Sequence, residues 1–163
     1  MGADYHAQRQ YKQLIQRAQP SFHRVLPDDG RLKTANKIRR VVMCSGKVYY
    51  DLVDARAQAG IDDVYILRLE QLHPFPIEAL TAALAPMAHA EMVWCQEEPH
   101  NMGAWVFANP EIEAVLKAID AKHKRPVYTG RKASASTATG LMSRHLRELE
   151  AFSKAALIDP LEA

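Results

Sequence analysis

The chain has 163 residues, enough for one domain or for one domain with an extension. Hydrophobic residues make up 48% and charged residues 25% of the sequence, proportions that are typical of a globular protein with a buried core. The net charge of +2, with scattered Lys and Arg residues, argues against nucleic acid or an anionic membrane as the partner. No apolar run approaches the ~18 residues that span a bilayer, and the N-terminus lacks the apolar core of a signal peptide, so we expect a cytoplasmic protein.

The first 37 residues precede the predicted core of the domain. Residues 3–18 favour a helix, because apolar side chains recur at helical spacing, at Tyr11, Leu14, Ile15 and Ala18. Pro20 ends this helix, and the segment that follows contains the turn signal Pro27-Asp28-Asp29-Gly30. We therefore predict a helical extension at 1–20, a connector at 21–37 and an α/β domain at 38–163.

From residue 38 onward, short apolar runs alternate with segments of helical periodicity. The runs predict strands at 38–44, 64–69, 92–95 and 125–128. The helices between and after them carry apolar stripes at 48–59, 77–87, 112–119 and 142–156. Gly60 ends the first helix, Pro76 suits the first position of the second, and residues 134–139 supply N-cap candidates for the last. This alternation predicts a three-layer α/β fold, with a mostly parallel sheet flanked by helices.

The side chains that could carry catalysis do not form a recognised pattern. Cys44 and Cys95 lie within apolar strands, which indicates buried thiols rather than a nucleophile or a disulfide and is consistent with a cytosolic compartment. The seven histidines include no pair at i, i+4 and no HExxH motif. Glu97 and Glu98 are adjacent, so they point opposite ways on an extended chain. The sequence therefore predicts no catalytic residue and no metal site.

Cationic and amide side chains follow the predicted parallel strands at their carboxyl ends. The Ser45-Gly46-Lys47 turn opens a helix whose free N–H groups favour phosphate, although its single Gly makes it neither GxGxxG nor a Walker A motif. Arg offers phosphate a bidentate fork and Lys a mobile charge, but each cation alone is more often a solvated surface residue. We predict a site for an anionic effector at this edge, formed by Ser45, Gly46, Lys47, Arg68, Gln71 and Arg131.

The apolar run at 92–95 changes abruptly into polar residues, and these end at an aromatic residue, Trp105. A strand that delivers polar groups to the carboxyl edge of an α/β sheet ends where such folds build their sites. Aromatic residues and Met are also enriched at the centres of protein interfaces. We predict a contact surface formed by Gln96, Glu97, Glu98, His100, Asn101, Met102 and Trp105. The alternative is a plain polar loop in which Trp105 caps the core of its own domain.

Four segments, in this order and spacing, resemble a known family. They are residues 42–52 (VMCSGKVYYDL), 68–76 (RLEQLHPFP), 94–105 (WCQEEPHNMGAW), and 128–131 (YTGR) with 138–140 (ATG). From Ser21 to Leu157 the chain resembles the C-terminal domain of the thiamine-diphosphate-dependent first component of the 2-oxoglutarate dehydrogenase complex. The resemblance implies the fold that the C-terminal domains of transketolases and 2-oxoacid dehydrogenases share.

The resemblance also implies a parent enzyme of the tricarboxylic acid cycle, which converts 2-oxoglutarate and enzyme-bound lipoamide to succinyl-lipoamide and carbon dioxide. In that family two preceding domains hold thiamine diphosphate and Mg²⁺, so no cofactor is expected in this chain. The implied partners are those domains, a second subunit in a homodimer, and the lipoyl-bearing acyltransferase component. The family's C-terminal domain also resembles a regulatory module for acetyl-CoA or AMP. In a eukaryote the compartment would be the mitochondrial matrix.

We therefore expect the C-terminal assembly and regulatory domain of a 2-oxoglutarate dehydrogenase, as a fragment that is inactive alone. One alternative is a stand-alone nucleotide-binding or acyl-CoA-binding module that uses Lys47 and the basic turn Arg131-Lys132. The other alternative is a purely structural dimerisation domain.

Overall fold

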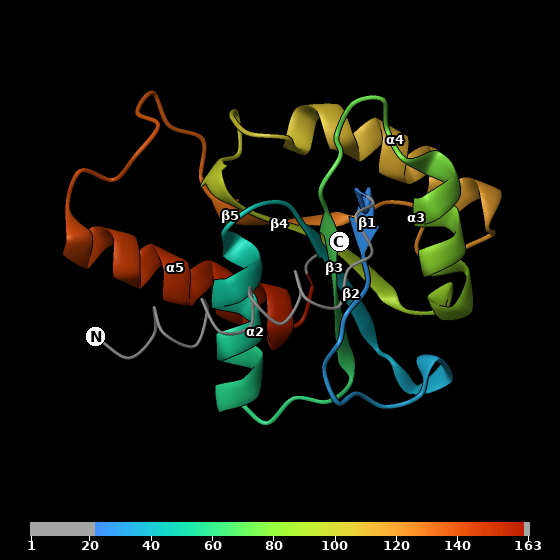
Figure 1. Cartoon of the computed structure of the whole chain (residues 1–163). Helices are drawn as coiled ribbons and strands as arrows, with labels where there is room; N and C mark the ends of the chain where they lie inside the picture. The colour runs from blue at the N-terminus through green and yellow to red at the C-terminus, as the bar shows by residue number, and fades with distance from the viewer. Residues whose placement is uncertain (1–21, 162–163) are drawn as a thin grey trace.

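The computed structural model describes residues 22–161, which form a five-stranded sheet with helices on both faces (Figure 1). The strands are β1 (Val25–Leu26), β2 (Arg40–Cys44), β3 (Val64–Leu69), β4 (Glu91–Pro99) and β5 (Val127–Arg131). The helices are α2 (Val48–Gln58), α3 (Ile77–Leu84), α4 (Trp105–Ala118) and α5 (Met142–Leu157), with short 3-10 helices η1 (Ala35–Lys37) and η2 (Ala85–Met87). The strand order is β1-β3-β2-β4-β5, and every neighbouring pair is parallel except β1 with β3.

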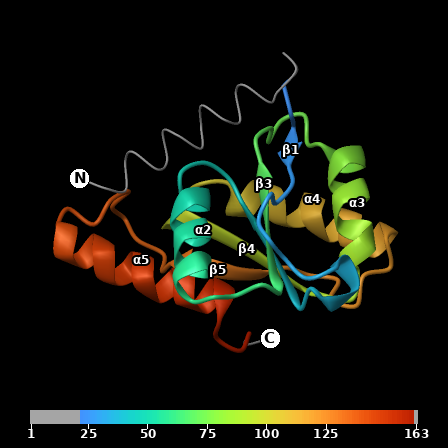
Figure 2. The ribbon, with the colours of Figure 1, turned by 60° about the horizontal axis from the view of Figure 1, so that its bottom comes forward.

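The two faces of the sheet bury separate halves of the core, because successive side chains of a strand point to opposite faces. On β2, Val41 and Met43 belong to the half covered by α3 and α4, whereas Val42 and Cys44 belong to the half covered by α2 and α5. Figures 1 and 2 show the same two pairs of helices on opposite sides of the sheet. The predicted three-layer α/β fold with a mostly parallel sheet is confirmed. Among the helices of residues 22–161, none is long and apolar enough to cross a membrane.

β4 and β5 extend further than the apolar pattern predicts. The pattern ends β4 at residue 95, but the strand continues to Pro99, because Gln96 is buried and its polar atoms are satisfied inside the domain. The pattern places β5 at 125–128, but the strand spans Val127–Arg131, so Gly130 and Arg131 lie in a strand rather than in a turn. A Cβ at Gly130 would collide with the Tyr128 hydroxyl and the Gln96 carbonyl, so this Gly permits a close approach of chains.

The predicted connector at 21–37 contains an edge strand. β1 pairs antiparallel with β3 through Val25 and Leu26. Further along, the fully buried carboxylate of Asp28 accepts hydrogen bonds from Arg56 of α2 and from the backbone N–H of Ile66 in β3 (2.7 Å). These contacts span many residues of sequence, so no local pattern reveals that the segment is attached to the sheet. The helix predicted at 3–18 lies outside the described residues.

α5 is buried at its carboxyl end and exposed at its amino end. Its predicted stripe is buried at Phe152 and Ala156, whereas Met142 and Leu146 are 71% and 56% exposed. The residues at 134–139 do not cap the helix, whose N-cap position is occupied by Leu141. At the other end, the buried guanidinium of Arg40 in β2 donates hydrogen bonds to the carbonyls of Ala155 (3.2 Å), Ala156 (3.0 Å) and Asp159 (2.9 Å).

Replacing Arg40 tests whether this contact holds α5 on the sheet. Arg40→Met should lower the free energy of unfolding by about 3 kcal/mol, because helix-end carbonyls and the Glu91 carboxylate lose a buried partner. Urea denaturation measures the loss. The control is Lys154→Met in the same helix, which should cost under ~1 kcal/mol because Lys154 is 61% exposed. Equal losses in the two variants would contradict the anchoring role of Arg40.

Candidate functional site

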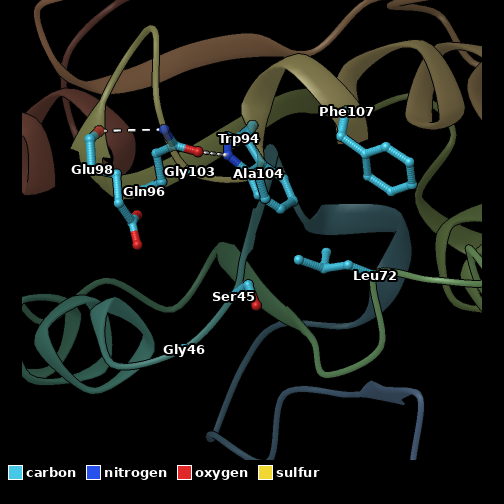
Figure 3. A pocket seen from close by; sticks show the side chains of 9 residues that line it. All are labelled: Ser45, Gly46, Leu72, Trp94, Gln96, Glu98, Gly103, Ala104 and Phe107. Carbon is cyan, nitrogen blue, oxygen red and sulfur yellow. Dashed lines mark hydrogen bonds between the residues drawn. The ribbon is translucent and has the colours of Figure 1, made fainter. Parts of the chain in front are cut away.

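A cavity of about 450 Å³ opens at the carboxyl edge of the sheet, between the ends of β2 and β4, the segment after β3 and the start of α4 (Figure 3). Its lining residues are Ser45, Gly46, Leu72, Trp94, Gln96, Glu98, Gly103, Ala104 and Phe107. Figure 3 shows Leu72 and Phe107 at one end, Glu98 at the other, and Trp94 between them. The cavity therefore has an apolar end and an acidic end.

The side chain of Gln96, which lines the cavity, connects the end of β4 to the start of α4 through hydrogen bonds. Its side-chain oxygen accepts hydrogen bonds from the indole N–H of Trp94 and from the backbone N–H of Trp105, both at 3.0 Å. Its side-chain nitrogen donates to the carbonyls of Met102 (2.7 Å) and Pro99 (3.2 Å). The side chain is almost fully buried, and satisfying both ends of a buried amide fixes the conformation of the loop.

The aromatic residues of the predicted contact surface pack on one another. The ring of Tyr128 lies 4.6 Å from the His100 ring and 5.2 Å from the Trp105 ring, centroid to centroid. The Tyr128 hydroxyl donates to the carbonyls of Glu98 (3.1 Å) and Arg131 (3.0 Å), and partial burial raises the pKa of Tyr128 to about 12. Trp105 is half-buried in this cluster, so it packs in part against its own domain, which is the alternative that the sequence left open.

The remaining residues of the predicted contact surface differ in their surroundings. Asn101 exchanges two hydrogen bonds with the backbone of Ser134, at 3.0 and 2.9 Å, and so ties this loop to the segment before α5. Glu97 lies 3.7 Å from the His145 ring, and Glu98 is exposed at the acidic end of the cavity. The polar groups of the loop are thus used largely within the domain.

Sequence reasoning missed the apolar side chains around the cavity. Val106 and Phe107, in the first turn of α4, are 68% and 45% exposed, and Ile77, the first residue of α3, is 50% exposed. The rings of Phe75 and Phe107 lie 6.3 Å apart. The sequence contained a signal for these exposed side chains, because Val106 and Phe107 follow Trp105 but do not belong to the apolar stripe that α4 buries.

The predicted effector residues do not all face one space. Ser45 and Gly46 line the cavity, and Lys47 follows them at the start of α2. Lys47 is 64% exposed, with its Nζ 2.7 Å from the Asp51 carboxylate. Partial burial is the largest influence on the pKa of Lys47 and lowers it, but the carboxylates of Asp51 and Glu97 outweigh it and leave the pKa raised.

Arg68 and Gln71 are engaged elsewhere. The Arg68 guanidinium lies 4.5 Å from the centre of the Tyr49 ring and donates to the Tyr50 hydroxyl (3.1 Å), both in α2. Its Nε is 2.6 Å from Glu70 Oε1, in an ion pair that lacks the angle of a hydrogen bond. The Gln71 side chain donates to the carbonyl of Pro74 (2.7 Å).

Arg131 also has partners of its own. Its guanidinium is nearly buried, lies 2.8 Å from the Glu148 carboxylate of α5 and donates to the Thr137 carbonyl (3.2 Å). Arg68 and Arg131 therefore lie toward α2 and α5, whereas the cavity opens beside α4.

The thiols are buried, as the sequence predicts. Cys44 and Cys95 are free and lie in neighbouring strands, in register with one another. Burial raises the pKa of both, that of Cys95 to about 12, so neither is present as a nucleophilic thiolate near neutral pH. Within residues 22–161, no cluster of three or more His, Cys, Asp or Glu side chains could hold a metal ion.

These features define a three-layer α/β domain with a partly apolar cavity at the carboxyl edge of its sheet. Residues 10–157 match the family described as 2-oxoglutarate dehydrogenase C-terminal. The chain belongs to this family, and the resemblance inferred from the four motifs is confirmed. The match begins at residue 10 rather than at residue 21, so the similarity includes part of the predicted extension.

Similar proteins include 2-oxoglutarate dehydrogenase E1 components of Brucella. The protein of Brucella abortus (strain S19) is 61% identical over 145 residues, which cover 84% of this chain and 14% of that relative. The proteins of Brucella anthropi and of Brucella melitensis biotype 2 are 60% identical over the same lengths and shares. The chain thus spans about one seventh of the length of these relatives.

The Gln96 amide can be tested directly. Gln96→Leu should lower the free energy of unfolding by about 3 kcal/mol, because buried groups of Trp94, Trp105 and Met102 lose their partner. The matched control is the neighbouring Glu97→Leu, which removes a longer contact to His145 and a charge near the exposed Lys47 and should cost less than ~1 kcal/mol. Urea unfolding, with near-UV circular dichroism of Trp94 and Trp105 as the second signal, measures both. Similar stability of the Gln96 variant and the parent chain would contradict the role of the amide.

Proposed function

We propose that this chain is the C-terminal assembly domain of a 2-oxoglutarate dehydrogenase E1 component. The observation that carries the proposal is an exposed apolar surface at the carboxyl edge of the sheet, in a chain whose family is that of the enzyme's C-terminal region. We call this surface the carboxyl-edge face. Its exposed members are Ile77, Val106 and Phe107, and the partly buried Leu72 and Phe75 lie beside Phe107. Contiguous exposed apolar side chains with a polar rim are typical of sites where another protein surface docks.

The carboxyl-edge face is suited to docking because its geometry is fixed. Gln96 holds the backbone N–H of Trp105 at the start of α4, and the next two residues of that helix are Val106 and Phe107. Phe107 is further placed by the rings of Phe75 and His73, each with its centroid 6.3 Å away. A surface held in place before binding loses less conformational entropy when it docks.

In this proposal the rest of the E1 chain supplies the chemistry. Thiamine diphosphate, with Mg²⁺, provides the carbanion chemistry that decarboxylates 2-oxoglutarate. The role of this domain is to dock on the remaining domains of its own chain and on the second subunit of a homodimer. That homodimer is cytoplasmic and works with the lipoyl-bearing acyltransferase component. The chain alone would then be inactive.

An assembly role makes a prediction for a full-length E1 chain that carries this domain. Val106→Asp should lower the melting temperature of the full-length enzyme by about 2–4 °C, because a carboxylate would be buried in the docked surface. The same change should leave the melting of the 163-residue chain unaltered, since Val106 is 68% exposed there.

The matched control is Ala114→Asp, an exposed position of α4 outside the carboxyl-edge face. Scanning calorimetry of both variants in both contexts gives the comparison. An equal shift for Val106→Asp in the isolated chain and in the full-length enzyme would argue that the face has no docking role.

A second role, binding of an anionic effector such as acetyl-CoA or AMP, is supported by one observation. Ser45 and Gly46 line the cavity, and the exposed ammonium group of Lys47 follows them at the first turn of α2. A helix N-terminus beside a cation favours phosphate. Lys47 is the most accessible of the predicted cations, although it pairs with Asp51. The nearly buried Arg68 and Arg131, and the amide of Gln71, would contribute only by exchanging their present partners.

Lys47→Ala should weaken binding of acetyl-CoA or AMP by about ten-fold, because one charge-assisted contact is lost. Titration of the melting temperature with each ligand measures this, since a ligand that binds the folded state raises stability. Lys117→Ala, another exposed lysine paired within its helix, is the control. If the Lys47 variant titrates like the parent chain, Lys47 is not part of an effector site.

A further inference from the structure

The two edges of the sheet are protected to different degrees. At one edge, β1 has only two residues and is followed by Pro27, which lacks the N–H that a further strand would need. At the other edge, β5 has five residues and pairs with β4 on one side. Among the described residues, no strand pairs with its other side. An open edge of this kind can pair with an added strand.

A groove of about 720 Å³ runs beside this open edge, between β5 and α5. Its lining residues are Tyr128, Thr129, Gly130, Arg131, Lys132, Ala133, Ser134, Arg144, Glu148, Ala151, Phe152 and Ala155. Thus consecutive residues of the edge strand and its continuation form one wall, and one flank of the helix forms the other. The small side chains of Ala151 and Ala155 leave room on the helix side. Figure 1 shows the first turns of α5 projecting past the β5 edge.

The groove is basic. Three cationic side chains and one carboxylate line it, which gives a net charge of +2. The carboxylate of Glu148 is shared between the Nε atoms of Arg144 (2.7 Å) and Arg131 (2.8 Å), and these hydrogen bonds lower its pKa. Lys132 has no carboxylate partner among residues 22–161 and is exposed. The uncompensated charge is therefore located where the edge strand leaves the groove.

The charge distinguishes between possible occupants. A second copy of the chain would bring the same basic groove to this edge, which would be repulsive. The N-terminal residues 1–21 would also be repelled, because they contain Arg9, Lys12 and Arg17 against a single carboxylate, Asp4. An acidic segment of another polypeptide has the complementary charge.

We infer that the β5–α5 groove binds an extended acidic segment of another polypeptide, which adds a strand to the open edge of the sheet. Backbone hydrogen bonds to β5 supply affinity, and alternate side chains supply specificity. Carboxylates of the segment pair with Lys132 and Arg144, and small apolar side chains between them contact Ala151 and Ala155. This surface is distinct from the carboxyl-edge face, so the inference does not rest on the assembly role.

A fluorescein-labelled heptapeptide of alternating glutamate and valine, capped at both ends, serves as the probe for the full 163-residue chain. Fluorescence anisotropy should detect binding that weakens as salt rises, and a peptide of alternating lysine and valine should not bind. Lys132→Glu should weaken binding by at least about ten-fold. Ala151→Trp should weaken it similarly without a change of charge, because the indole fills the groove.

The control variant is Lys122→Glu, which makes the same charge change at an exposed lysine outside the groove and should leave the affinity unaltered. Three results would each overturn the inference. The first is that the glutamate peptide does not bind. The second is that the Ala151→Trp variant binds the peptide as tightly as the parent chain does, which indicates general charge attraction. The third is that AMP or inorganic phosphate displaces the peptide at a concentration similar to that of the peptide itself, which indicates a site for small anions.

Discussion

The buried carboxamide of Gln96 determines the shape of the carboxyl edge. It accepts hydrogen bonds from the indole of Trp94 and from the backbone at Trp105, and it donates to the loop between them. These bonds make a polar loop rigid and set the point at which α4 begins. The positions of Val106 and Phe107 follow from that point, because they are the next two residues of the helix. One side chain thus connects the end of a central strand to the proposed docking surface.

Most of the fold could be predicted from the sequence because its core depends on local apolar spacing. The central strands β2 and β3 and the stripes of α2, α3 and α4 follow that spacing closely. The ends of β4 and β5 could not be predicted, because Gln96 and Gly130 resemble loop residues and are explained only by contacts across the sheet. The attachment of Asp28 to Arg56, 28 residues away, likewise has no local signal.

The cavity lies at the edge of the sheet where the sequence predicts a site, but of the predicted effector residues only Ser45 and Gly46 line it. The strand order brings the predicted segments to one edge, as parallel strands require, yet two of the three predicted cations, Arg68 and Arg131, have partners within the domain. Arg40 holds the end of α5, Arg56 holds the connector, and Arg131 pairs with α5. A sequence does not distinguish such arginines from free ones, because their partners are distant in the chain. Lys132, beside the open edge of β5, has no carboxylate partner among residues 22–161, whereas the exposed Lys47 and Arg144 pair with Asp51 and Glu148.

The most direct test of the account is hydroxyl-radical footprinting of this domain alone and within a full-length E1 chain. If the carboxyl-edge face docks on the rest of the enzyme, oxidation of Phe75 and Phe107 should fall several-fold in the full-length chain. Tyr65, a partly buried residue that lines a different cavity together with Ile38 and Met87, should react equally in both and provides the internal reference. Unchanged oxidation of Phe75 and Phe107 would contradict the account.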